Sequence, residues 1–249
     1  MRPVFLHAHA ALLPATGVGA VAGFDPVAAG IPRKTLKTMT RAVQLGVAAV
    51  GQALSAHAGW TSVAPERRGL YVGASPQQGD AADLAEAIAA SGPSPDLRAF
   101  GERGVPLVPP LWLVKGLSNN VLGYASANHD FRGDNGNWCD GALGGAVALC
   151  AAIHAVAEGR VDLAVGGAAD SLCGAEVIVG GPCAEGAVFF VFSAEPGPCL
   201  AQATVPTLAG ANGLPGELGA VAIPAVLARA VGSGPLAAAG GVLLRRVVA

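Results

Sequence analysis

The clearest pattern of hydrophobic positions lies between residues 133 and 170 and predicts one strand–helix–strand unit. Asn135–Cys139 is expected to form a strand that reaches a tight turn at Asp140-Gly141. Ala142–Glu158 is rich in helix formers, holds no proline and is followed by Gly159, which is typical of a helix end. Val161–Val165 is then expected to form the second strand.

The predicted helix is apolar around nearly its whole circumference. One half carries bulky side chains and the other half carries small ones, and only His154 and Glu158 are polar. Such a helix can be packed closely from both sides, so we expect it to lie inside the molecule, between two sheets.

Periodicity predicts the remaining elements as well. We expect strands at Val4–Ala10, Arg67–Ala74, Glu185–Phe192 and Gly241–Val248, helices at Thr35–Ala58, Ala81–Ala90 and Leu111–Asn128, a helix running to Val231, and an irregular stretch at Ser91–Pro110.

Composition narrows the class of protein. Only 13% of residues are charged and 52% are apolar, which favours an oligomer over a monomer. A net charge of −2 without a charged run argues against nucleic acid or an anionic membrane as the main partner. No apolar run of about 18 residues predicts a membrane span.

The cysteines and the first residues bear on the compartment and on metal binding. The five cysteines form no C-x-x-C pair and match no zinc pattern, so no metal or other cofactor is expected and a reduced cytoplasm fits best. Residues 1–23 resemble a signal peptide, but His7, His9 and Pro14 interrupt the apolar segment that one needs.

The turn before the apolar helix is the best place for chemistry, because the free N–H groups of a first helical turn favour a thiolate or an oxyanion. Here the chain resembles the β-ketoacyl synthases of the thiolase superfamily. Their elbow reads G-x(6)-T-A-C-x-S-S, followed by a helix, a G-x-x-D-L-A-L strand and a double glycine. Gly133 matches the first glycine, 159–165 match the helix exit and strand, and the nucleophilic cysteine falls on Ala142.

Further segments resemble the same family. Asn119 and Gly123 match N-M-x-x-G without a gap before Gly133, and Glu185–Phe192 matches the E-G-A-G strand. The long excursion that precedes this strand in ketosynthases is reduced here to Ser171–Ala184. The two family histidines have no counterpart after His154, and Glu217 stands where one of them would lie.

The resemblance implies an α/β fold: a thiolase-like layered structure with a mixed five-stranded sheet, a buried central helix and a reduced second half. It implies a ketosynthase N-terminal-like domain over 1–195, with a reduced C-terminal portion, 196–249, packed on the same domain. It covers about residues 33–195 well and the remainder weakly.

The resemblance also implies a function. Without a nucleophile at Ala142 and without both histidines, the chain lacks groups that the decarboxylative condensation needs. It is similar to non-catalytic chain-length factors, which form dimers with an active ketosynthase and meet an acyl carrier protein through that complex. Such a subunit would serve a type II polyketide or fatty-acid-like pathway, for example one that makes aryl polyenes. The residues implied to line the interface or tunnel are Asn135, Asn137, Trp138, Cys139, Asn119 and Asn120.

Two other functions remain open. Cys139 could act as the nucleophile of an acyltransferase or hydrolase, with a base among His129, His154, His7 and His9. Alternatively, the chain could be a homodimeric scaffold or binding protein.

Weaker signals have simpler interpretations. Arg33, Lys34, Lys37 and Arg41 form either a solvated face or a docking patch for an acidic partner. Gly17–Gly23 lacks the spacing of a dinucleotide loop, and Gly73-x-Ser75 lacks the second glycine of a hydrolase elbow.

Overall fold

The computed structural model describes residues 1–76, 81–94, 96–176, 180–204, 220–231, 236–239 and 242–246. Glu217 therefore lies outside the described residues. Of the strand predicted at 241–248, residues 242–246 are described, and 241, 247 and 248 lie outside.

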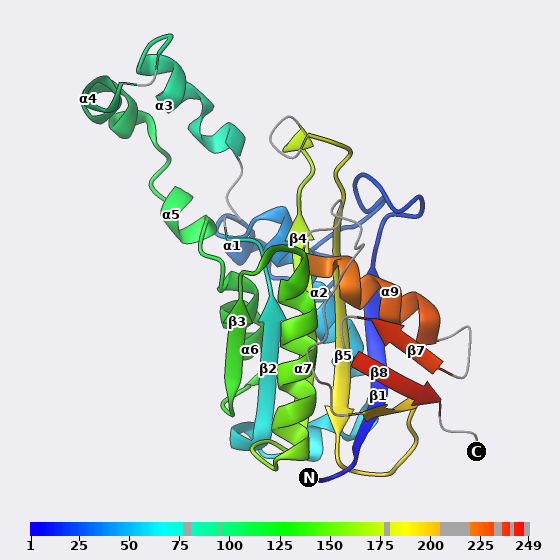
Figure 1. The fold of residues 1–249 in the computed structure, drawn as a ribbon. Helices are drawn as coiled ribbons and strands as arrows, with labels where there is room; N and C mark the ends of the chain where they lie inside the picture. The colour runs from blue at the N-terminus through cyan, green and yellow to red at the C-terminus, as the bar shows by residue number, and fades with distance from the viewer. Residues whose placement is uncertain are drawn as a thin grey trace.

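A mixed sheet is the centre of the molecule (Figure 1), with strand order β3-β2-β4-β5-β1-β6-β8-β7. Strands β2 and β4 run parallel to each other, β3 runs parallel to β2, and all other neighbouring pairs are antiparallel. The strands are β1 Val4–Leu12, β2 Arg68–Gly73, β3 Asn135–Trp138, β4 Leu163–Ser171, β5 Glu185–Ser193, β6 Ala201–Thr204, β7 Leu236–Ala239 and β8 Val242–Arg246.

The predicted layered α/β class is confirmed, with one difference in the sheet. The expected five strands correspond to β3-β2-β4-β5-β1, and β6, β8 and β7 extend this sheet beyond β1. The extension exists because Val4–Leu6 at the start of β1 also pairs with Ala201–Ala203 on its other edge.

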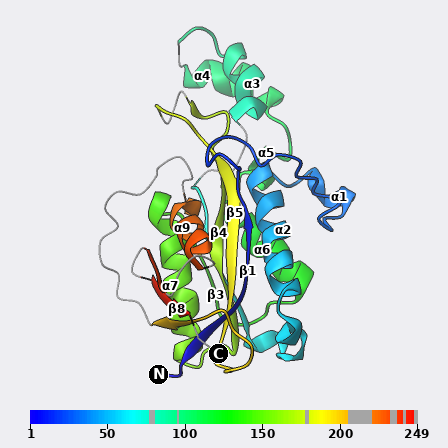
Figure 2. The same ribbon diagram turned by 90° about the vertical axis from the view of Figure 1, so that its right-hand side faces the viewer.

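Helices cover both faces of the sheet (Figure 2). Helix α7 (Gly144–Ala157) and helix α9 (Ala222–Val231) pack on one face, and the β7–β8 hairpin lies on their far side. Helix α2 (Arg41–Ser55) and helix α6 (Asn120–His129) pack on the other face. Short helices α3 (Ala85–Ala90), α4 (Leu97–Ala99) and α5 (Trp112–Lys115) lie in an arm that projects from the sheet.

The strand–helix–strand unit is present as predicted, and β2 lies between its two strands, β3 and β4. A 3-10 turn, Gly141–Leu143, leads into α7. The helix is buried except for a half-exposed stripe of Val147, Ala151 and His154.

The helix predicted at 35–58 is divided in two. Helix α1 (Arg33–Leu36) ends early, because the N–H groups of Thr38 and Met39 turn back to the carbonyls of Thr35 and Leu36. The Thr38 hydroxyl also donates to the Thr35 carbonyl, at 2.8 Å. A side chain that bonds to local backbone in this way competes with helix continuation, and α2 begins only after Thr40.

The helix predicted at 111–128 is also divided, into α5 and α6. The amide of Asn120 donates to the carbonyls of Val114 and Lys115, at 2.6 and 3.1 Å, and so satisfies the last turn of α5. Asn120 is buried and serves the chain's own backbone. The stretch 91–110, predicted to be irregular, contains α4 and two further short helical turns.

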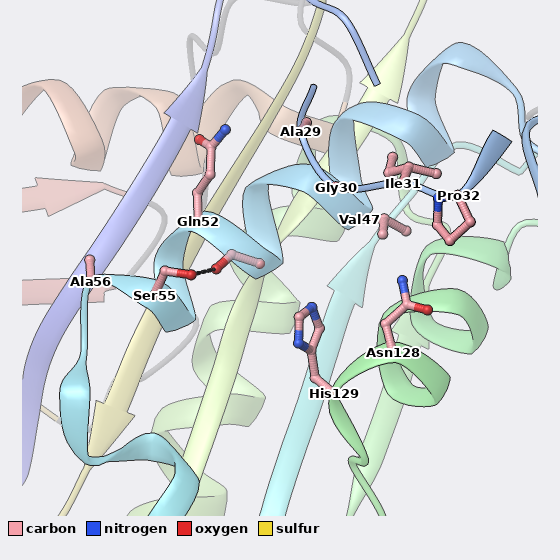
Figure 3. A pocket seen from close by; sticks show the side chains of 11 residues that line it. Ala29, Gly30, Ile31, Pro32, Val47, Gln52, Ser55, Ala56, Asn128 and His129 are labelled. Atoms are coloured by element: carbon pink, nitrogen blue, oxygen red, sulfur yellow. Dashed lines mark hydrogen bonds between the residues drawn. The ribbon is translucent and has the colours of Figure 1, made fainter. Parts of the chain in front are cut away.

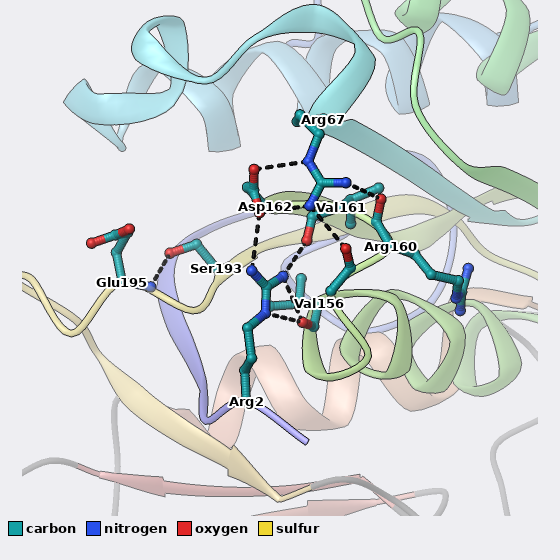
Figure 4. Close-up of polar contacts among 9 residues, drawn as sticks. Arg2, Arg67, Val156, Arg160, Val161, Asp162, Ser193 and Glu195 are labelled. Atoms are coloured by element: carbon teal, nitrogen blue, oxygen red, sulfur yellow. Dashed lines mark hydrogen bonds and ion pairs between the residues drawn. The ribbon is translucent and has the colours of Figure 1, made fainter.

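An ionic network ties the beginnings of three strands together at the end of the sheet opposite the 3-10 turn (Figure 4). Asp162, just before β4, accepts from Arg67, which precedes β2, at 2.9 and 2.8 Å, and from Arg2, which precedes β1, at 3.0 Å. Arg2 also donates to the carbonyl of Val156 near the end of α7. The hydrogen bonds from Arg67 and Arg2 hold the pKa of Asp162 well below its usual range.

This network predicts a pH-dependent change in stability for Asp162→Asn. Because the folded pKa is lowered, the ionised carboxylate stabilises the fold above the unfolded pKa of about 3.9, and this stability is lost as the pH falls toward the folded pKa. We expect the variant to lose about 1 kcal/mol at pH 7, a modest value since the pair is partly exposed. The loss should shrink steadily below pH 4. Urea unfolding at pH 7 and at pH 3 measures it, with Glu102→Gln as the control at an exposed carboxylate; an unchanged loss at pH 3 would contradict the assignment.

A second prediction concerns the contact of α7 with β2. A Cβ on Gly73 would overlap the backbone of Gly144 and Gly145, which a side-chain rotation cannot relieve. Gly73→Ala should therefore lower the free energy of unfolding by about 3 kcal/mol. Gly123→Ala is the matched control, because it lies in α6 with open space around it and should stabilise by about 1 kcal/mol. Equal midpoints of thermal unfolding for the two variants would contradict this packing.

Candidate functional site

The candidate site is the elbow, which we define as residues 138–145 between β3 and the first turn of α7. It lies where the parallel strands β2, β3 and β4 end. The Trp138 carbonyl accepts the N–H of Ala74 at 2.9 Å, so the elbow is bonded directly to the segment that follows β2. Gly141 has a φ of +49°, a conformation that an L-residue rarely adopts and that reverses the chain into the helix.

Ala142, predicted from the motif to stand at the family's nucleophile position, lies half-buried in the 3-10 turn that opens α7. Free N–H groups at such a turn stabilise negative charge, but the methyl group of Ala142 offers no thiol or hydroxyl to use them. The geometry of a nucleophile elbow is present without a nucleophile at that residue.

Cys139 carries an exposed thiol at the same elbow. Its Sγ lies 3.8 Å from the carbonyl oxygen of Ser75 and 3.5 Å from the amide nitrogen of Asn137. In the part of the chain that the structure describes, no imidazole is hydrogen-bonded to this sulfur. The pairing that an acyltransferase or hydrolase at Cys139 would need is therefore not present.

The candidate bases for Cys139 lie elsewhere. His129 packs edge-on against Trp60, with 5.8 Å between ring centroids, and its carbonyl accepts from Arg68, the first residue of β2. The elbow adjoins Gly73, at the other end of that strand. His154 lies near the end of α7, where it pairs with Glu158, and His7 and His9 lie on β1.

His129 instead lines a hollow of about 750 Å³ between α2, α6 and the segment 29–32 (Figure 3). The side chains of Asn128 and Gln52 also lie along this hollow. Burial lowers the pKa of His129. The hollow therefore holds a neutral imidazole and two amides, which suits a neutral ligand better than an anion.

A polar cluster that the sequence analysis did not identify adjoins the elbow. Asp170, in β4, is buried and accepts both the hydroxyl of Ser75, at 2.7 Å, and the N–H of Ala220, at 3.1 Å. The N–H of Ser171 donates to the same carboxylate at 2.9 Å. Burial raises the pKa of Asp170, and these three donors partly offset the effect.

This cluster could be found only with the fold known, because its members are about 95 and 50 residues apart. The Ser75 hydroxyl donates to a carboxylate rather than to an imidazole, so it lacks the base that a serine nucleophile uses. The cluster lies at the end of the sheet next to the elbow, and its hydrogen bond to Ala220 anchors the chain just before α9.

The other residues implied at an interface have different surroundings. Trp138 is half-buried and stacks on Tyr71 of β2, with 6.3 Å between ring centroids. Asn137 is half-buried, and its side-chain oxygen has no hydrogen-bond partner among the described residues. Asn135 and Asn119 are exposed. Strand β3 itself forms the edge of the sheet and is paired only with β2 among the described strands.

Two kinds of feature are absent from the described residues. None of the described helices is both long and apolar enough to cross a bilayer. Within the same residues, no group of three or more His, Cys, Asp or Glu side chains is arranged to hold a metal ion.

The cysteines allow a direct test of this geometry. Cys139 is exposed, whereas burial raises the pKa of Cys150 in α7 to about 11 and so suppresses its thiolate. Iodoacetamide applied to the native protein at pH 8 should alkylate Cys139 within minutes. The rate of alkylation at Cys150 should be at least 100-fold lower. Peptide mass spectrometry measures both, with the urea-unfolded chain as the control in which the two rates converge. Equal rates in the native protein would show that α7 is not enclosed.

Comparisons with known proteins agree with this geometry. The sequence model described as β-ketoacyl synthase, N-terminal domain, matches residues 10–189. No curated protein matches the chain.

Several solved structures share the fold at low identity. A type II polyketide acyl carrier protein in complex with its ketosynthase (AntDE:AntF) superposes with a TM-score of 0.67 at 18% identity, over 82% of this chain and 67% of that one. The ishigamide ketosynthase/chain length factor gives 0.61 at 22% identity, over 80% and 65%. A β-ketoacyl synthase from Burkholderia phymatum STM815 gives 0.60 at 18% identity, over 85% and 66%.

The chain thus spans about two thirds of the length of each of these structures. The match of the family model covers well over half of the chain and includes the elbow, β4 and most of β5. This protein belongs to the β-ketoacyl synthase family, with the fold of its N-terminal domain.

Proposed function

We propose that the protein is a non-catalytic ketosynthase-like subunit, of the chain-length-factor type, that pairs with an active ketosynthase. The observation that carries this proposal is the elbow: its turn, helix and glycine contacts are intact, yet Ala142 occupies the turn and no described imidazole is bonded nearby. A scaffold that keeps the architecture of a reactive site without its reactive groups is suited to binding and shaping rather than to chemistry.

The unpaired edge of β3 supports pairing with a second subunit. An edge strand offers a row of free N–H and C=O groups, to which a strand of another chain can add. Asn135 and Asn137 lie on this strand, and the exposed Asn119 lies where the arm returns to the body, whereas Asn120 is buried and bonded to the chain's own backbone. The buried, unpartnered oxygen of Asn137 would gain a donor from a partner strand. Trp138 and Cys139, at the end of the strand, would then lie beside the tunnel for the acyl chain.

The arm supplies a second surface for the partner. Its exposed apolar side chains include Ile88, Leu97, Val105 and Leu113. Single exposed leucines are ordinary, but several on one projecting segment suit an interface. Figure 1 shows the arm at the same end of the sheet as the start of α7, so one partner could contact both the arm and β3.

An acyl carrier protein is the second proposed partner. Arg33, Lys34 and Lys37 are exposed on α1 and the turn after it, and no described carboxylate pairs with them. Arg41 differs, because it is half-buried and its guanidinium pairs with the buried Glu185 at 2.9 Å. These three cations form a patch that suits the acidic surface of an acyl carrier protein. The carrier protein would come from a type II polyketide or fatty-acid-like pathway, such as one producing aryl polyenes.

Co-expression with a ketosynthase encoded beside this protein tests the pairing. Size-exclusion chromatography with mass detection should show a one-to-one complex, and its condensing activity should survive Cys139→Ala unchanged. Asn135→Lys on the edge strand should weaken the complex at least tenfold, whereas Asn128→Lys, at the far end of α6, should not. A stable homodimer that ignores the ketosynthase would favour a scaffold, and a covalent acyl adduct extended by this chain alone would disprove the proposal.

The carrier-protein patch has its own test. Lys34→Glu together with Lys37→Glu should reduce carrier-protein affinity of the complex by about tenfold at low salt and much less at high salt. The ketosynthase should remain bound, which separates docking from assembly. Glu66→Lys and Glu158→Lys, at exposed carboxylates outside the arm and β3, serve as charge-change controls, and equal losses in both double variants would refute the assignment.

A further inference from the structure

A second cavity lies at the end of the sheet opposite the elbow. It has a volume of about 910 Å³ and is formed by β1, the segment 56–64, the start of β4 and the loop between β5 and β6. Much of its lining is apolar, from Ala58, Val63, Ala64, Leu163 and Leu200. The family elbow does not reach it, because β5 runs antiparallel to β4 and ends at this cavity.

Ser193, His7 and Pro198 form a linear hydrogen-bonded series in this cavity. The Ser193 Oγ lies 2.8 Å from His7 Nε2, and His7 Nδ1 lies 3.0 Å from the Pro198 carbonyl oxygen. A carbonyl can only accept, so Nδ1 carries the proton of the neutral imidazole. Nε2 is then the acceptor, and the Ser193 hydroxyl points its hydrogen at a base.

The position of His7 in β1 gives an independent indication of function. The pairing of β1 with β5 shifts register between Leu6 and Ala8, which leaves His7 as the extra residue of a β-bulge. Bulges redirect side chains and are frequent beside active sites. His57 stacks on His7 with 4.6 Å between ring centroids and holds the imidazole plane.

The loop after β5 supplies donors to the same place. The Glu195 N–H donates to Ser193 Oγ at 3.1 Å (Figure 4). The N–H of Gly197, which also lines the cavity, has no acceptor among the described residues. Among the described residues that line the cavity, the guanidinium of Arg67 is paired with Asp162 and is therefore not free to attract an anionic ligand.

We propose that Ser193 is a nucleophile, with His7 as its base and the Pro198 carbonyl as the group that orients it, and that this cavity cleaves small uncharged carboxylic esters. The arrangement is that of a serine, histidine and acceptor triad in which a backbone carbonyl replaces the usual carboxylate. Ser193 is only 3% exposed at the cavity floor, which restricts the acyl group to a slender one such as acetyl.

The reaction balances without another reagent. The Ser193 oxygen bonds to the ester carbonyl carbon while its proton moves to His7 Nε2, and the N–H group of Gly197 would receive the oxyanion. The bond from carbonyl carbon to alkoxy oxygen then breaks, and the imidazolium returns its proton to the leaving alcohol. Water, deprotonated by His7, hydrolyses the acyl-serine to a carboxylic acid and restores the free hydroxyl.

Active-site labelling of the purified wild-type chain tests the proposal without any ketosynthase. A small fluorophosphonate should modify Ser193, as located by peptide mass spectrometry, and hydrolysis of p-nitrophenyl acetate should be lost in proportion. Ser193→Ala and His7→Gln should each lower the rate by about 100-fold or more. Ser62→Ala is the matched control, because Ser62 lines the same cavity but donates to the Gly59 carbonyl at 2.7 Å.

Two results would overturn the assignment. Native wild-type chain that is not labelled at Ser193, or is labelled equally at Ser62 or Ser75, would show that the Ser193–His7 bond is only structural. Hydrolysis that survives in a folded His7→Gln variant would show the same. Because the assay uses the isolated chain, its failure leaves the proposed pairing with a ketosynthase untouched.

Discussion

The fold depends on how closely the backbone of α7 approaches the sheet. Gly73 touches the first turn of α7, and a Cβ on Gly166 would lie 2.6 Å from the Cβ of Ala152 on the same helix. On the other side of the helix, a Cβ on Gly145 would collide with the Ala220 carbonyl at the start of α9. At these closest contacts the helix has no room for large side chains, and this explains why its sequence is rich in glycine and alanine.

That constraint also shapes the electrostatics of the elbow. Because α7 and α9 meet directly over the ends of the strands, the carboxylate of Asp170 is sealed from water and must find its donors inside the protein. It finds them in the Ser75 hydroxyl and in two backbone N–H groups. The polar groups at the elbow thus bond mainly to one another. Because Ala142 carries no thiol or hydroxyl at the elbow, this arrangement holds the shape of the site.

The sequence predicts those parts of the fold whose pattern is local. The strand–helix–strand unit, β1, β2 and β5 follow from hydrophobic spacing, and the motif around Ala142 indicates the family. The breaks at Thr38 and Asn120 were not predicted, because each depends on one side chain that bonds to nearby backbone in preference to continuing a helix. The extension of the sheet through β6 depends on pairing between residues almost 200 positions apart, which no local pattern encodes.

The candidate sites show the same division. Cys139 and Ala142 could be located from the motif, since both lie within one short segment. Asp170 with Ser75, and Ser193 with His7, are brought together only by the strand order, and the bulge at His7 has no signature in the sequence.

The mixed direction of the strands has a consequence for the protein as a whole. Strands β4 and β5 have nine residues each, which at about 3.3 Å per residue gives roughly 30 Å from one end of the sheet to the other. If all the strands were parallel, the loops that follow them would all lie at the same end of the sheet. Because β5 runs antiparallel to β4, polar side chains gather at both ends of the sheet, with Asp170 at one end and Ser193 at the other. Substitutions at one end can therefore accumulate without changing the other.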